Sequence, residues 1–382
     1  MNEGSPMRPT VLAYFFPDWQ TDARNDAWFG AGWTEWELLR RATPRFDGHR
    51  QPRVPAAGEE NDADPAVMAR QIELAHQHGI DGFLVDFYWY DDGPYLNRAL
   101  DEGMLTAEMP DDFRIALMWA NHELVDIFPS RHPHRKPPVL KSGAIDRPAF
   151  ERMARHVIDT YFTHPNHLLI DGKPFFSVYE VGTLLEGLGG VEGARDALDW
   201  FRRETIAAGF PGLHLDMVVW GFGVLPTAVT VADPATLMRA LGADSATSYV
   251  WIHHTAIERH PWPLGEWGDV QRDAFDAYEG YVEALPVPFH PNVSVGWDPS
   301  PRTVQFAEWE DGTYPWMTVF DASPDDFRQG LLAARQFLAD HPVTNPLLTI
   351  NAWNEWTEGA ALLPDTHFGT RFLETITEVF PR

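Results

Sequence analysis

Short apolar runs recur along the chain, and the intervals between several of them carry apolar residues spaced three or four apart. Short apolar runs between turn residues are typical of buried strands, whereas a spacing of three or four is typical of helices. The expected strands cover residues 10–16, 82–88, 114–120, 174–179, 214–220, 245–251, 292–296 and 347–352. Strands that alternate with helices form a parallel sheet, and eight of them predict an α/β fold, a single (β/α)8 TIM barrel with long βα loops.

Several helix ends are marked in the sequence. Asp64 followed by Pro65 is typical of a helix N-terminus, and Ser323 followed by Pro324 repeats this pattern before the last expected strand. The residues expected to face the barrel are Met68, Ile72 and Ala75 in the first helix, Phe327, Leu331 and Leu338 in the second, and Phe368, Phe372 and Ile376 in a terminal helix. Their spacing predicts amphipathic helices that cover the sheet.

No Ser- or Gly-rich linker divides the chain, so we expect an N-terminal tail over residues 1–9 and one barrel domain over residues 10–382. The connection over residues 17–61 is much longer than the usual few residues, and such loops are either functional or disordered. It contains Trp33 and Trp36 within a strongly aromatic stretch, which argues against disorder. We expect a folded lid or cleft wall there.

The composition excludes several classes of protein. The chain has 56 acidic residues against 29 Lys and Arg, a net charge of −27, so its field would repel phosphate and we expect no nucleic-acid partner. Cysteine is absent, which excludes disulfides, thiolate catalysis and cysteine-based zinc sites. Neither an apolar leader nor a stretch of about 18 apolar residues occurs, so we expect a cytoplasmic protein without membrane insertion. The sequence indicates no oligomeric state.

Polar and aromatic residues follow the expected strands closely. In TIM barrels the C-terminal ends of the strands form the active face, so these residues are the candidates for binding. They are Asp86, Tyr88, Trp89, Asn121, Glu123, Tyr179, Trp251, His253, Trp297, Asp298, Asn354 and Trp356. Aromatic faces pack against the C–H surface of a sugar ring, and carboxylates and amides bind its hydroxyls. The pattern therefore predicts an oligosaccharide or polysaccharide ligand.

Glu355 and Glu358 follow the last expected strand and alternate with tryptophans. Cleavage of a glycosidic bond requires a proton donor to the leaving oxygen and a second carboxylate, and these two residues supply the pair. A spacing of three between glutamates is common on helix surfaces, but the position after a buried strand favours catalysis. The sequence thus predicts a glycosidase with Glu355 and Glu358 as its catalytic residues.

Structural explanations stand beside several of these assignments. Asp86 after a strand could cap a helix or pair with an arginine. Glu35, with Trp33 and Trp36, could either hold the long loop in place or take part in the cleft. His253 and His254 would suggest a metal site only with a third convergent ligand. We expect them to contact substrate or lie at the surface, and we expect neither a metal nor an organic cofactor.

Several motifs resemble those of the WbsX group, which contains relatives of glycoside hydrolase family 99 and is often labelled as glycosyltransferases of polysaccharide gene clusters. The motifs are Tyr14-Phe15-Phe16-Pro17, Gly32-Trp33-Thr34-Glu35-Trp36, Trp119-Ala120-Asn121, Gly296-Trp297-Asp298 with Pro301-Arg302, and Asn354-Glu355-Trp356-Thr357-Glu358-Gly359. The resemblance covers about residues 10 to 375 and implies a retaining endo-acting α-mannosidase-like barrel, with residues 10–382 as its catalytic domain.

In that family the reaction passes through a 1,2-anhydro sugar. The resemblance implies that Glu355 deprotonates the 2-hydroxyl, while Glu358 protonates the leaving oxygen and later activates water. An α-mannoside-like or α-rhamnoside-like substrate fits this scheme. One departure is that His122-Glu123-Leu124 follows the Trp-Ala-Asn motif, where the group usually has Glu-Asn-Trp, and this leaves the sugar accepted near the third strand open.

Two other functions remain open from the sequence. The first is a glycosyltransferase of polysaccharide (O-antigen type) biosynthesis, although neither a Gly-rich phosphate cradle nor an Asp-x-Asp motif in a nucleotide-binding context occurs. The second is a noncatalytic carbohydrate-binding barrel. Sugar nucleotides would distinguish the first from a hydrolase, and binding without turnover would identify the second.

Overall fold

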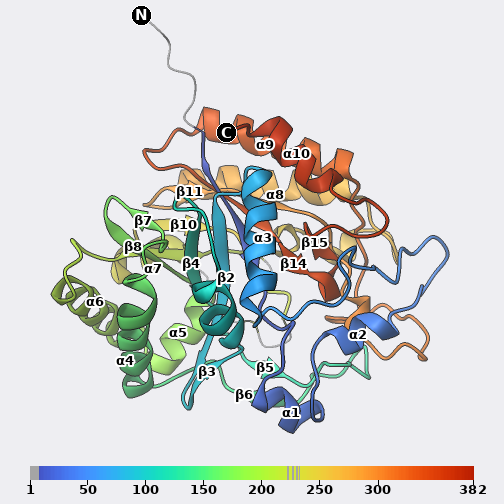
Figure 1. Ribbon diagram of the computed structural model, residues 1–382, viewed down its shortest axis with the longest axis horizontal. Helices are drawn as coiled ribbons and strands as arrows, with labels where there is room; N and C mark the ends of the chain where they lie inside the picture. Colours follow the sequence, from blue (N-terminus) through green and yellow to red (C-terminus); the bar gives the residue numbers. More distant parts are fainter. Residues whose placement is uncertain (1–7, 222, 226–227, 229–230, 232) are drawn as a thin grey trace, which may run out of the picture.

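A computed structural model describes residues 8–221, 223–225, 228, 231 and 233–382 (Figure 1). Within these residues a parallel sheet runs through β11 (Phe289–His290), β10 (Ser245–Thr247), β9 (His214–Val218), β8 (Lys173–Val178), β4 (Arg114–Trp119), β2 (Gly82–Tyr90), β1 (Thr10–Phe15), β13 (Leu347–Asn351) and β12 (Asn292–Ser294). Only Pro291 separates β11 from β12, so these two segments occupy one barrel position and join the ends of the sheet. The predicted α/β barrel is confirmed.

Several strand boundaries differ from the prediction, and two of the differences bear on the site. β2 continues to Tyr90 and pairs with the short antiparallel strand β3 (Gly93–Tyr95), so Trp89 lies within the strand rather than after it. β10 ends at Thr247, and Trp251 begins a 3-10 helix, η4 (Trp251–His254). These boundaries decide which side chains face the barrel interior.

The strands are buried on both faces, and their side chains alternate between them. On β1, Leu12 and Tyr14 belong to the cluster inside the barrel, whereas Val11, Ala13 and Phe15 belong to the cluster between sheet and helices. This alternation follows from the two-residue period of a strand. Both faces of a parallel barrel must therefore be apolar, and the short apolar runs meet this requirement.

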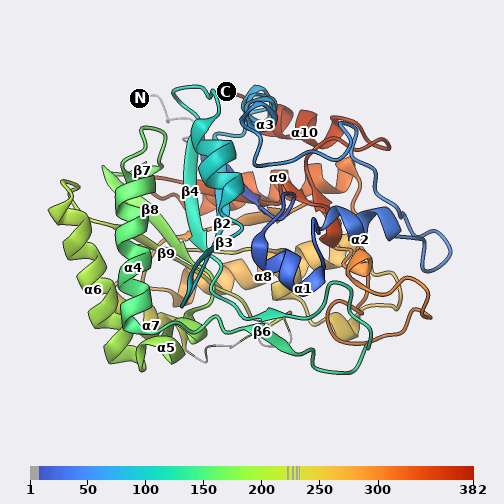
Figure 2. The same ribbon diagram turned by 60° about the horizontal axis from the view of Figure 1, so that its bottom comes forward.

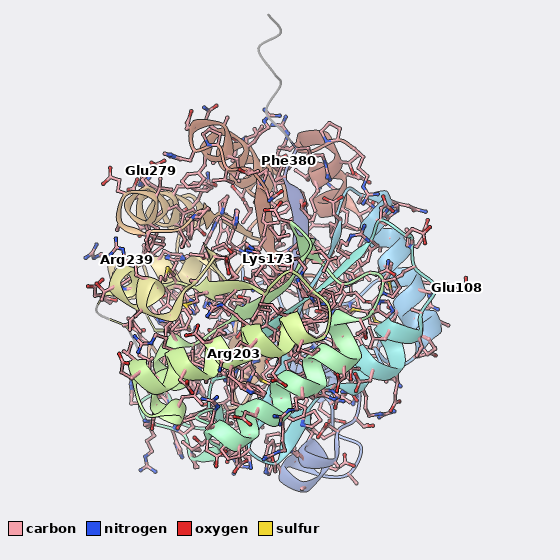
Figure 3. The ribbon with its side chains drawn as sticks, turned by 90° about the vertical axis from the view of Figure 1, so that its left-hand side faces the viewer. Glu108, Lys173, Arg203, Arg239, Glu279 and Phe380 are labelled. Atoms are coloured by element: carbon pink, nitrogen blue, oxygen red, sulfur yellow. The ribbon has the colours of Figure 1, made fainter. Side chains whose placement is uncertain are left out.

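Helices cover the outside of the barrel. They are α3 (Pro65–Gln77), α4 (Arg147–His156), α5 (Val181–Leu188), α6 (Val191–Ala207), α7 (Pro234–Leu241), α8 (Trp267–Ala284), α9 (Pro324–Asp340) and α10 (Arg371–Val379). Asp64 caps α3 by accepting from the Ala66 amide at 2.8 Å, and Ser323 forms a capping box on α9. α9 and α10 lie side by side (Figure 1), and α4 runs beside α6, which carries the labelled Arg203 (Figure 3). The predicted terminal helix begins at Arg371, so Phe368 precedes it.

The long connection over residues 17–61, which we call the first loop, is folded as expected. It contains α1 (Ala23–Phe29) and α2 (Trp36–Arg41). The ring of Trp33 lies 5.9 Å from that of Phe128, in the loop after β4, which also carries the β5–β6 hairpin (Leu124–Val125 and Val139–Lys141). Figure 2 shows α1 close to β6, and the contact between Trp33 and Phe128 joins the two loops.

The N-terminal tail was predicted for residues 1–9, of which residues 1–7 lie outside the described part of the chain. Arg8 donates a hydrogen bond of 2.7 Å to Asp81 and another of 3.2 Å to the carbonyl of Phe380. No helix among the described residues combines the length and hydropathy needed to cross a bilayer.

Candidate active site

A cavity lies at the C-terminal ends of the strands. The predicted residues that line it are Asp86, Tyr88, Glu123, Tyr179, His253, Trp297, Glu355 and Glu358. The cavity is further lined by Phe16, Asp18, His122, Phe128, Tyr249, Arg302 and Tyr314, among others. Both predicted catalytic glutamates therefore open into one space.

The last βα turn brings the two glutamates together. Glu355 closes the short strand β14 (Asn354–Glu355), and Glu358 ends the 3-10 turn η7 (Trp356–Glu358). Gly359 has a φ of +69° and reverses the chain into β15 (Ala360–Ala361), which pairs with β14. A Cβ at Gly359 would lie 2.7 Å from that of Asp298, so both the conformation and the space require glycine. The turn is thus fixed by its own sequence.

Arg302, on the 3-10 helix η6 (Ser300–Arg302), lies between the two glutamates. Its Nη2 donates to Glu355 Oε1 at 2.5 Å, and its Nη1 donates to Glu358 Oε1 at 2.5 Å. Tyr314 also donates to Glu358 Oε1 at 2.5 Å. One guanidinium therefore holds both carboxylates, and Arg302 itself is only 5% exposed.

Glu35 completes this cluster from the first loop. Arg302 Nη2 donates to its two carboxylate oxygens at 3.1 and 3.2 Å, and Thr357 donates a further hydrogen bond to Oε2. Arg302 Nε in turn donates to Thr357 at 3.0 Å. The first loop and the last βα turn are thus tied together through one arginine.

Burial dominates the ionisation of Glu355 and Glu35. It raises the pKa of Glu355 well above its usual value, although Arg302 opposes the shift, and the neighbouring Glu358 and Glu35 raise it further. Burial also raises the pKa of Glu35, again against Arg302. Glu355 Oε2 is buried without a hydrogen-bond partner among the described residues, so it is available to a ligand. A carboxyl of this kind is well placed to exchange a proton with a bound molecule.

Asp86 and a group of aromatic rings form the opposite wall. Tyr249 donates to Asp86 Oδ2 at 3.0 Å, while Oδ1 has no partner within the described part of the chain, and burial raises the pKa of this carboxyl. The Tyr179 ring lies 5.3 Å from that of Tyr249 and 6.2 Å from that of His253. Burial lowers the pKa of His253 to about 3, so its ring is neutral at pH 7. The wall offers aromatic faces and a free acceptor, as a sugar ring requires.

The remaining predicted binding residues lie outside the cavity lining. Asn121 bridges to the backbone of Glu180 at 2.7 and 2.8 Å, and Asp298 accepts from Gln51 at 2.7 Å and lies 2.8 Å from His49 Nε2. Trp251 stacks on Trp267, and Trp89 packs against Phe87 and His156. Asn354 forms hydrogen bonds with the backbone of Phe16, and Trp356 lies in the hydrophobic cluster inside the barrel. Their observed contacts are with the protein itself.

Arg302, Glu35 and Tyr314 were not among the predicted catalytic or binding residues. Arg302 lies in the motif Pro301-Arg302, and Glu35 lies in the motif around Trp33. These motifs marked both residues in the sequence, but they did not indicate which residues they contact. Tyr314 lies in none of these motifs. It comes from a long loop between β12 and α9, where neither spacing nor strand position marks it.

Comparisons with known proteins agree with this architecture. The sequence pattern of the family described as Glycosyltransferase WbsX matches residues 11–376. Uncharacterized protein WxcX of Xanthomonas campestris pv. campestris (strain B100) is 28% identical over 388 residues, which cover 98% of this chain and 50% of that protein. The chain thus spans about half the length of the curated relatives it matches.

Two solved structures share the fold. A glycoside hydrolase-like protein superimposes with a TM-score of 0.62 at 13% identity, covering 100% of this chain and 97% of that one. A family 99 endo-α-mannosidase from Bacteroides thetaiotaomicron gives a TM-score of 0.57 at 12% identity, covering 97% and 96%. These likenesses concern the barrel alone. The family match extends over nearly the whole described barrel, and the chain belongs to the WbsX family.

Proposed function

We propose that this protein is a retaining glycoside hydrolase that cleaves an α-mannoside-like or α-rhamnoside-like bond through a 1,2-anhydro sugar. The observation that carries the proposal is that Glu355 and Glu358 line one cavity and share Arg302. Two carboxyl groups converging on one sugar ring are the minimum that glycosidic cleavage requires.

In the proposed reaction, Glu355 removes the proton of the 2-hydroxyl as that oxygen attacks the anomeric carbon. Glu358 gives a proton to the departing glycosidic oxygen, so the C1–O bond breaks as the C1–O2 bond forms. Water then opens the anhydro ring with Glu358 as base, and O2 recovers a proton from Glu355. An attacking hydroxyl within the substrate has a high effective concentration, so no enzyme nucleophile is needed.

The cavity walls support sugar recognition. Asp86 Oδ1 and Glu355 Oε2 are the buried acceptors left without a partner in the described residues that line the cavity. The neutral ring of His253 also has an unpartnered Nδ1. Hydroxyls of a pyranose would satisfy all three, since a buried polar atom without a partner is costly.

The test compares Glu355→Gln and Glu358→Gln on α-mannosyl and α-rhamnosyl substrates with good and poor leaving groups. We expect each variant to lose about 10²–10⁴-fold in turnover of unactivated glycosides. With a nitrophenyl leaving group, Glu358→Gln should recover much of the rate of the first step, seen as a burst of nitrophenol, because that group departs without a proton. Its second step stays slow because the base for water is missing, and Glu355→Gln should show no burst. Glu374→Gln, on the exposed side of α10, is the matched control. Wild-type turnover in both active-site variants would rule the mechanism out, and proton NMR of the first product would reveal inversion.

A glycosyltransferase is the second candidate, because the family is described as Glycosyltransferase WbsX. The same two glutamates could pass a glycosyl group to a sugar hydroxyl instead of water. Incubation with sugar nucleotides and a glycan acceptor distinguishes the two, since a transferase releases the nucleotide and a hydrolase does not. Glycan binding without turnover in both assays would favour a noncatalytic carbohydrate-binding barrel.

A further inference from the structure

Glu35 is a fully buried acid that does not line the cavity. Its exposed fraction is 0%, and its two oxygens accept from Arg302 and Thr357. It precedes α2 in the first loop and lies 267 positions before Arg302 in the sequence. An isolated buried carboxylate is strongly unfavourable, so its position between these donors calls for an explanation beyond holding the loop.

The cluster contains more negative than positive groups. Arg302 is the cation that bonds Glu35, Glu355 and Glu358 at the same time. The acids that face Glu355 are Glu35 from the first loop, Glu358 from η7 and Asp86 from β2, and the hydroxyls of Tyr88 and Tyr249 also face it. One guanidinium therefore stabilises three carboxylates. A change in the charge or position of Glu35 changes how strongly Arg302 stabilises ionised Glu355.

Glu35 and Glu355 differ in how their oxygens are used. Both oxygens of Glu35 already accept hydrogen bonds, whereas Glu355 Oε2 has no partner among the described residues. Glu35 also bonds the same Nη2 that holds Glu355. It is thus placed to fix both the orientation of Arg302 and the proton occupancy of Glu355.

We propose that Glu35 is a positioning residue, which acts through Arg302 to set the orientation and the protonation of Glu355 and so makes the first loop part of the catalytic machinery. This inference rests on the proposed function. Glu35 influences the proton-transfer group without touching the substrate, so its effect falls on the chemical step rather than on binding.

The test is the pH dependence of hydrolysis by Glu35→Gln and Glu35→Asp. Glutamine keeps the shape but removes a like charge that raises the pKa of Glu355. Glu355 must be ionised to act as base. The acid limb of the pH profile of kcat should therefore move to lower pH by about one unit. We also expect kcat at its optimum to fall at least about tenfold, with KM changed less than about twofold. Glu35→Asp should restore the wild-type acid limb, and Glu37→Gln, an exposed-side neighbour on α2 that pairs with Arg40, should change nothing.

A second measurement does not depend on turnover. The carboxyl carbons of isotopically labelled glutamate can be followed by NMR against pH, with Glu355→Gln identifying the signal of Glu355. Its titration should move to lower pH in Glu35→Gln. If Glu35→Gln does not fold, Thr357→Val replaces it, because loss of the hydroxyl donor favours neutral Glu35 and should move the Glu355 signal in the same direction.

The outcomes separate the two proposals. A shifted titration without hydrolysis of any glycoside supports the role of Glu35 in the cluster and overturns the proposed hydrolase. Hydrolysis with an unchanged acid limb and titration overturns the inference and leaves the hydrolase standing. A larger effect on KM than on kcat would also overturn it, because that result would place Glu35 in substrate binding.

Discussion

Replacing Arg302 with methionine tests the buried charge cluster most directly. The substitution keeps the length of the side chain but removes the guanidinium from Glu35, Glu355 and Glu358. These three carboxyl groups are between 0% and 7% exposed, so water cannot replace the lost partner. Removing one member of a buried ion pair costs about 3–5 kcal/mol, and here the same cation serves three acids. We expect a penalty of at least this size at pH 8.

The penalty should depend on pH. Arg302 lowers the pKa of both Glu35 and Glu355 against the effect of burial, so its removal raises both values further. A carboxyl whose folded pKa is raised binds its proton more tightly in the native state. Its contribution to stability is complete below the ordinary pKa, near 4.5, and is lost as the pH rises through the folded value. The variant should therefore lose more stability than the wild type between pH 5 and pH 8.

Urea denaturation of both proteins at pH 5 and pH 8 measures this difference. The destabilisation by Arg302→Met should be smaller at pH 5 than at pH 8, because both acids bind a proton more readily at the lower pH. Arg40→Met is the matched control, because Arg40 also contacts two acids, Glu37 and Glu59, but is half exposed. It should change stability by less than about 1 kcal/mol at either pH. An equal penalty for Arg302→Met at both pH values would refute the reasoning.

Two buried aspartates give further predictions. Asp86→Ala should lower kcat/KM about 10–100-fold by removing the polar group that has no protein partner at the cavity, whereas Asp86→Asn should retain most activity, because burial favours the protonated acid that asparagine resembles. Steady-state kinetics on the best glycoside decide this, and equal losses in both variants would contradict it. Burial raises the pKa of Asp62 to about 8, so wild-type stability falls as the pH rises towards that value, while Asp62→Asn cannot ionise. The Tm of Asp62→Asn relative to wild type should thus increase between pH 5 and pH 8.5, and a constant difference would contradict the shift.

The strands and the position of the cavity were predictable from the sequence, because burial on both faces of a parallel strand leaves a clear apolar run. The exact ends of the strands were not. β2 continues two residues beyond the predicted end, so Tyr88 faces the barrel interior while Trp89 packs outside it. The direction of a side chain that follows a strand is not set by the sheet. Within a strand, successive side chains point to opposite faces, so the position in the strand sets the direction. This rule removes Trp89 from the cavity lining and keeps Tyr88 in it.

The glutamate pair was predictable because both members lie in one turn, and spacing along the chain then determines proximity. The partners of the pair were not predictable in this way. Arg302 lies 53 positions from Glu355, and Glu35 lies 322 positions from Thr357. Such contacts depend on how the first loop folds over the barrel, and the motifs around Glu35 and Arg302 gave no indication that they meet.

The placement of acids in this protein runs against the stability of the fold. Asp18, Glu35, Asp86 and Glu355 are all buried at the cavity or directly beneath it, and burial raises the pKa of each. A core chosen for stability alone would replace them with apolar side chains, since a buried ion pair is often weaker than good apolar packing. Local conflicts of this kind are expected at functional sites. Glu355 lies in the closing turn of the barrel, whereas Asp18 and Glu35 lie in the first loop. The first loop thus supplies one acid to the cavity lining and another to Arg302, which a loop that only covered the barrel would not need.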